Sequence, residues 1–109
     1  MINSNSICRY RWSEASSGVA NGHETTKFAF PITTGMSFNR TLWQLTARQI
    51  GHEARALMNI NQAGSTFWAP VINLAREPRW GRNIEVPGED VRTNIRHASK
   101  MLVSACGQI

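Results

Sequence analysis

The sequence predicts an α/β fold, and three segments support that prediction. The segment from Asn39 to Asn59 has the apolar spacing of an amphipathic helix. An apolar run from Ser65 to Ala75 follows it and is typical of a buried strand. A weaker strand candidate from Cys8 to Ala15 precedes the helix, and a Gly- and Thr-rich loop from Ser16 to Ser37 connects this strand to the helix. Strand, loop, helix and strand in this order make one βαβ unit with parallel strands.

The predicted helix begins after Asn39, which stands where an N-cap residue is expected. Asn39 also opens the glycosylation pattern Asn-Arg-Thr, but its place directly before the helix favours the N-cap interpretation. The apolar residues that recur with a period near 3.6 are Leu42, Leu45, Ile50, Ala54, Leu57 and Met58. Gly51 in mid-helix costs about 1 kcal/mol relative to Ala, which a close approach to a neighbouring backbone would explain.

The apolar run after the helix is too short for a second helix and lacks the polar alternation of a half-exposed strand. We therefore expect a buried parallel strand. Pro70 has no N–H group to donate, so the paired part should end near Ala69. Further along, the segment 91–109 can form a helix, with one apolar side made by Ile95, Ala98, Met101, Leu102 and Ala105.

Length and composition limit the classes of function. The 109 residues suffice for one domain, and twelve Lys and Arg against seven Asp and Glu give a net charge of +5. The basic residues are scattered among aromatic and acidic neighbours, which argues against nucleic-acid binding. No apolar run approaches the roughly 20 residues of a membrane span, and the first residues lack the apolar stretch of a signal peptide. Cys8 and Cys106 leave the redox compartment open.

A charged loop, Arg76 to Asp90, follows the predicted strand. It contains three arginines and four carboxylates, with two prolines and two glycines that restrict its backbone. Ligands of α/β sheets bind beyond the carboxyl ends of the strands, so this loop lies where a site would be built. Two interpretations remain open: Arg82 can donate to sugar hydroxyls or a carboxylate, or the loop arginines Arg76, Arg79 and Arg82 only neutralise Glu77, Glu85 and Glu89.

Four stretches form a recognisable pattern: WSEA at 12–15, FNRTL at 38–42, IGHEARA at 50–56, and TFWAPVINLAREPRWGRNIEVPGED at 66–90. Together they resemble the N-terminal domain of glycoside hydrolase family 3, particularly its β-xylosidase-like branch. The similarity runs from about Tyr10 to Asp90, and the last motif is long enough to be highly specific. The chain departs from the family at Arg11 and at Ser16-Ser17, where relatives usually read WWSEALHGV, and beyond Asp90.

The resemblance implies the N-terminal part of a (β/α)₈ barrel, with about two strands and one or two helices present. It also implies an exo-acting β-glycosidase that hydrolyses with retention, which needs two carboxyl groups about 5 to 5.5 Å apart. Glu14 matches a carboxylate that accepts hydrogen bonds from the sugar in the cleavage subsite and disfavours a C6 group. Arg82 matches an arginine that donates to the same sugar, and Trp68 matches an aromatic residue of that subsite. Asp90, the only aspartate, does not match the nucleophile motif, so no catalytic residue is assigned.

From this resemblance we expect a partial barrel domain at residues 1–90 and a divergent tail at 91–109. The expected partner is a xylo-oligosaccharide, without nucleic acid, membrane or cofactor. The histidines His23, His52 and His97 are unclustered, so no metal site is expected. The resemblance implies secretion for full-length members, and the 109-residue chain alone should be inactive. The alternative is a non-catalytic sugar-binding or scaffold remnant of such an enzyme.

Overall fold

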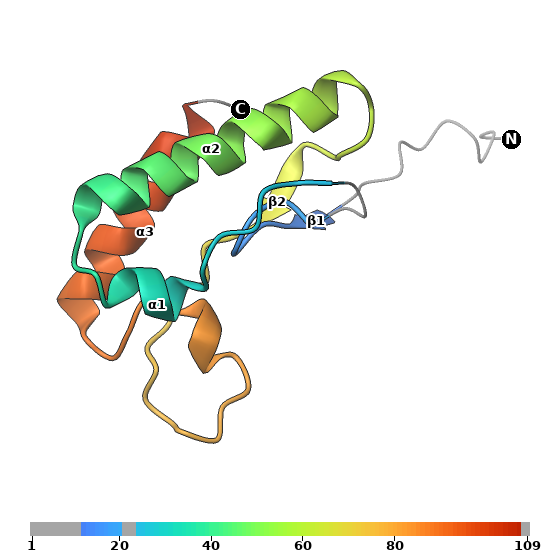
Figure 1. The fold of residues 1–109 in the computed structure, drawn as a ribbon. Coiled ribbons are helices and arrows are strands. Elements are labelled where there is room, and N and C mark those ends of the chain that lie inside the picture. The colour runs from blue at the N-terminus through green and yellow to red at the C-terminus, as the bar shows by residue number, and fades with distance from the viewer. Residues whose placement is uncertain (1–11, 21–23, 108–109) are drawn as a thin grey trace, which may run out of the picture.

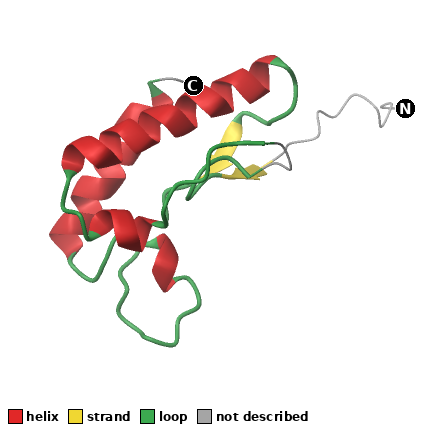
Figure 2. Cartoon of the chain, in the orientation of Figure 1, coloured by secondary structure: helices red, strands yellow, loops and turns green. Residues whose placement is uncertain are grey.

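The computed structural model describes residues 12–20 and 24–107. Two short strands and three α-helices follow one another along the chain, with a 3₁₀ helix in the charged loop (Figures 1 and 2). In order, the elements are β1 (Trp12–Glu14), α1 (Pro31–Gly35), α2 (Arg40–Asn59), β2 (Thr66–Trp68), η2 (Asn83–Glu85) and α3 (Val91–Cys106). None of the helices within the described ranges combines the length and the apolar character needed to cross a membrane.

The two strands pair in parallel, and α2 lies between them in the sequence. Their register sets Trp12 opposite Thr66 and Glu14 opposite Trp68. This confirms the βαβ unit predicted from the order of apolar patterns. The first part of the predicted strand, residues 8–11, lies outside the described residues.

The expectation of a buried second strand was wrong. The strand ends at Trp68, just before Pro70 as predicted, but its residues are only partly buried and Trp68 is 51% exposed. Helices α2 and α3 lie on the same side of the two strands (Figure 1). The apolar side chains of the other face therefore have solvent beside them, which an apolar sequence pattern alone cannot reveal.

Helix α2 begins where the sequence predicted. The side chain of Asn39 accepts a hydrogen bond of 3.0 Å from the backbone N–H of Leu42, which is the N-cap geometry. The predicted apolar face was only partly correct, because Leu42 and Leu45 are exposed. The buried residues are Trp43, Ala47, Ile50, Gly51 and Ala54. The buried face therefore shares Ile50 and Ala54 with the predicted face and adds Trp43 and Ala47.

Helix α3 contains most of the segment beyond Asp90, as predicted. The Asp90 carboxylate accepts a hydrogen bond of 2.6 Å from the backbone N–H of Thr93 and caps the helix. Its buried face was partly mispredicted: Ile95 is 61% exposed. The side that packs on α2 is made by Asn94, His97, Ala98, Met101 and Ser104. The boundary proposed at residue 90 stays a prediction.

One apolar cluster joins the strands to the helices. Its buried members are Ala15, Val19, Ala47, Ile50, Ala54 and Met101, and Phe28, Leu57, Phe67 and Ala69 pack against them. In β1, Ser13 is buried while Trp12 and Glu14 on either side are exposed. Alternate side chains of a strand point to opposite faces, so Trp12 and Glu14 lie on the face away from the helices.

The charged loop is anchored at its end by a close backbone contact. A Cβ atom added to Gly35 in α1 would lie 2.1 Å from the carbonyl oxygen of Pro87. Val86 beside it is fully buried. Only a glycine permits this approach, so α1 and the segment Val86–Pro87 hold the loop in place.

Candidate functional site

The end of each strand places one predicted site residue. Glu14 is the last residue of β1, Trp68 is the last residue of β2, and the register sets them opposite each other. Trp68 also contacts Trp12 edge to face, with ring centroids 4.6 Å apart. Glu14 and Trp68 thus lie at the carboxyl end of the sheet, where α/β folds build their sites, and Trp12 lies beside Trp68 on the same open face.

A shallow hollow of about 490 Å³ brings the three predicted residues together. Arg82 reaches it from the charged loop, although 14 positions separate it from Trp68 in the sequence. The full lining is Glu14, Ser16, Ser17, Phe30, Trp68, Arg82, Ile84 and Glu85. A carboxylate, a guanidinium and flat aromatic faces in one hollow are the groups that bind a sugar by its hydroxyls and its C–H surface.

The Glu14 carboxylate is held by the turn that follows its strand. Its Oε1 accepts hydrogen bonds from the backbone N–H groups of Ala15 at 3.0 Å and Ser16 at 2.8 Å. Ser16 and Ser17, which replace the usual Leu-His pair of the resembled family, line the hollow beside it. A carboxylate oriented by backbone donors keeps further acceptor sites, since two oxygens offer about four lone pairs.

Arg82 forms an ion pair with Glu85 within the hollow. Its Nε lies 3.0 Å from both carboxylate oxygens, and its Nη2 lies 2.5 Å from Oε2. The hydrogen bond from Arg82 holds the pKa of Glu85 below its ordinary value, and Glu85 raises the pKa of Arg82. Arg82 therefore both neutralises Glu85 and lines the hollow, whereas the sequence had suggested these two roles as alternatives.

The other loop arginines lie away from the hollow. Arg79 pairs with Glu77 at 2.9 Å, and the Arg79 side chain is 90% exposed. Arg76 donates to the Asn73 side chain at 3.1 Å. These contacts fit the loop-holding interpretation, and an ion pair exposed to this degree adds little stability.

Glu85 and Phe30 are lining residues that sequence reasoning did not assign to the site. Glu85 had been interpreted only as a residue that fixes the loop. Its spacing of three residues from Arg82 was the available signal, because groups three apart can meet on a helical turn, here η2. Phe30 directly precedes α1, far from any strand end, and the sequence carries no comparable signal for it.

None of the residues that line the hollow is a histidine. No group of three or more His, Cys, Asp or Glu suited to a metal ion occurs among residues 12–20 and 24–107. His52 is exposed on α2, whereas His97 is buried between α2 and α3. His23 lies outside the described residues.

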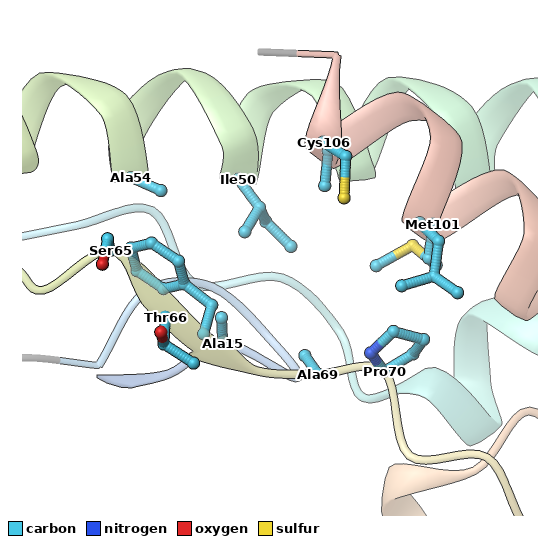
Figure 3. A pocket seen from close by; sticks show the side chains of 12 residues that line it. Ala15, Ile50, Ala54, Ser65, Thr66, Ala69, Pro70, Met101 and Cys106 are labelled. Carbon is cyan, nitrogen blue, oxygen red and sulfur yellow. The ribbon is translucent and has the colours of Figure 1, made fainter. Parts of the chain in front are cut away.

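A second hollow of about 330 Å³ lies between β2 and the helices α2 and α3 (Figure 3). Its lining is apolar apart from Ser65, Thr66 and Cys106. Small side chains from each layer, among them Ala54 and Ala105, leave this space open. It is a packing gap between sheet and helices and lacks the charged groups of the first hollow.

Comparisons with known proteins show similarity to one group of enzymes. No protein-family model matches the chain. A β-xylosidase/α-L-arabinofuranosidase of Medicago sativa subsp. varia is 44% identical over an alignment of 98 residues that covers 81% of this chain. β-D-xylosidase 1 of Arabidopsis thaliana is 43% identical with the same alignment length and coverage. A solved family 3 exo-β-xylosidase, XlnD bound to a xylobiose aziridine probe, matches 90% of this chain with a TM-score of 0.80 and 33% identity. Over the residues it aligns with, the chain is similar to β-xylosidase-like enzymes of glycoside hydrolase family 3.

The match covers a small part of each relative. The chain spans 13% of the length of the two plant enzymes and 14% of the solved xylosidase chain. Two parallel strands and their helices are thus shared with a family 3 enzyme.

Proposed function

We propose that this chain forms the first sugar-binding part of a retaining, exo-acting β-glycosidase of the β-xylosidase/α-L-arabinofuranosidase type. The substrate would be a xylo-oligosaccharide from xylan breakdown, met outside the cell by a secreted enzyme. The observation that supports this most is the meeting of Glu14, Trp68 and Arg82 in one hollow at the carboxyl ends of two parallel strands. These are the residues that the family motifs had suggested.

Each group has a distinct part in the proposal. The Glu14 carboxylate accepts hydrogen bonds from sugar hydroxyls, and the Arg82 guanidinium donates to them. Trp68 presents an apolar face to the sugar ring. Glu14 also fills the space that a C6 hydroxymethyl group would need, which favours pentoses over hexoses.

The two strands would be the first two of a (β/α)₈ barrel. Trp12, Glu14 and Trp68 lie on the sheet face that the helices leave open, and a barrel turns that face toward its interior. Barrel closure would therefore bury the exposed indoles. It would also surround the hollow with later loops, among which a nucleophile and a proton donor would lie.

The 109-residue chain by itself should bind sugar without hydrolysing it. Retention requires two carboxyl groups about 5 to 5.5 Å apart across the scissile bond. Asp90, the only aspartate, caps α3, while Glu85 pairs with Arg82. Incubation of the pure chain with an aryl β-xyloside should release no nitrophenol above a protein-free blank, and a rate that scales with chain concentration would contradict the assignment.

The second candidate is a non-catalytic sugar-binding remnant of such an enzyme, favoured by the engagement of Asp90 and Glu85 in contacts within the chain. Sequencing of expressed transcripts beyond the codon for Ile109 separates the two. A reading frame that continues into barrel strands with an Asp nucleophile supports the enzyme. A stop codon in every transcript supports the remnant.

A further inference from the structure

Glu85 stands out in the hollow because it fixes the group proposed to donate to the sugar. Both of its carboxylate oxygens contact the Arg82 guanidinium, through Nε and Nη2. The Glu85 side chain is 22% exposed and that of Arg82 is 45% exposed, so the carboxylate is the inner partner. An arginine held on one edge has few rotamers left, and its second edge, made by Nη1 and the other N–H of Nη2, has no contact with Glu85.

The backbone that carries Glu85 is itself held. Glu85 ends the short helix η2, and its N–H donates to the Arg82 carbonyl at 3.0 Å. The next residue, Val86, is fully buried, and Pro87 packs against Gly35. The position of the Arg82 guanidinium is therefore linked to α1 through Glu85.

The charges of the hollow also depend on Glu85. Among its lining residues, Glu14 and Glu85 are acidic and Arg82 is basic. With Glu85 ionised, the hollow has an excess of one negative charge. A ligand carboxylate would then meet like charge, whereas the hydroxyls of a neutral sugar would not.

We propose that Glu85 is a positioning and selectivity residue: it turns the free edge of Arg82 toward two neighbouring hydroxyls of a neutral sugar and cancels the charge that would otherwise attract a uronic acid. This rests on the proposed sugar-binding function. It adds a specific expectation, namely discrimination between xylose units and acidic sugars of the same ring size.

The test measures sugar binding by the full 109-residue chain. Xylobiose and D-glucuronate are titrated separately, and the indole N–H signal of Trp68 is followed in ¹H–¹⁵N spectra. In Glu85→Gln the xylobiose affinity should fall roughly tenfold, the scale of a lost charge-assisted contact, and the preference for xylobiose over glucuronate should fall by at least as much. Glu77→Gln removes the same charge from the exposed Arg79 pair outside the hollow, and it should change either affinity less than twofold.

A double-mutant cycle separates positioning from general structural damage. If Glu85 acts through Arg82, Glu85→Gln should have little further effect in an Arg82→Gln background. If the spectrum of Glu85→Gln shows that this variant is unfolded, Glu85→Asp is tested in its place. Its shorter acid should keep the preference for neutral sugar while weakening xylobiose binding.

The outcomes distinguish this inference from the proposed function. In one outcome the wild type binds xylobiose, while Glu85→Gln binds it with an affinity within twofold and with the same preference over glucuronate. This result overturns the role of Glu85 and leaves the sugar-binding function standing. A well-dispersed wild-type spectrum that does not respond to xylobiose overturns both.

Discussion

Acid should destabilise this chain through one buried histidine. His97 on α3 is 3% exposed and packs edge to face on Trp43 of α2, with ring centroids 5.3 Å apart. Trp43 in turn donates its indole N–H to the Thr34 carbonyl at 2.7 Å. Burial lowers the pKa of His97 from 6.5 to about 4, because the charged imidazolium would lose its hydration there.

The size and sign of the effect follow from proton linkage. Between pH 6.5 and 4 the unfolded chain binds a proton at His97 that the folded chain does not, so stability falls as the pH falls through this window. The lowered pKa of His97 corresponds to roughly 3 kcal/mol of stability, at 1.36 kcal/mol per tenfold change in proton affinity, and most of it is lost by pH 4. Above about pH 7.5 the histidine should contribute no pH dependence.

Urea titrations of the wild type, His97→Gln and His52→Gln between pH 8 and 4 would measure this. His97→Gln should lose most of the dependence between pH 6.5 and 4.5, whereas His52→Gln, at an exposed position of α2, should keep it. Carboxylates also make the free energy of unfolding of all three proteins depend on pH in acid. The informative quantity is therefore the difference in free energy of unfolding between each variant and the wild type at each pH. Equal slopes for His97→Gln and wild type, or an NMR titration of His97 near pH 6.5, would refute the reasoning.

Two further predictions concern the helices. Asn39→Ala removes the acceptor of the Leu42 N–H and should lower the free energy of unfolding by about 1 kcal/mol in a urea titration. A decrease of less than a few tenths of a kcal/mol would show that Asn39 does not stabilise the helix as an N-cap. Ala105→Leu adds apolar atoms to the gap between β2 and the helices and should raise the free energy of unfolding by about 1 kcal/mol. The matched change Ala56→Leu, at an exposed site of α2, should raise it less, and an equal gain would show that the gap is not being filled.

The sequence was most informative where a local contact decides the structure. Asn39 and Asp90 mark the starts of two helices because each side chain accepts a bond from an N–H three residues away. The parallel pairing of β1 and β2 followed from the order of apolar patterns, and it placed Glu14 and Trp68 at the same edge. The motif resemblance then added Arg82, which periodicity alone could not have joined to them.

Other features depend on contacts between distant segments. Leu42 and Leu45 continue the apolar pattern of α2, yet they are exposed, because α3 packs along the side that contains Trp43 and Ala47. Hydrophobic spacing could not choose between these stripes. Likewise, the charged loop offers several pairings of arginine with carboxylate, and only the path of the backbone selects Glu85 for Arg82.

The helix beyond Asp90 also bears on the site, although its sequence departs from the family pattern. Asn94 of α3 donates its side-chain amide to the Gly88 carbonyl at 3.0 Å, and the Gly88 carbonyl also accepts from the Ala75 N–H at 3.1 Å. These bonds join both ends of the charged loop to α3. Because Val86 and Pro87 are buried between this junction and α1, the segment that presents Arg82 and Glu85 is held from two sides. Helix α3 thus helps to hold the loop that carries Arg82 and Glu85, although its sequence departs from the family pattern.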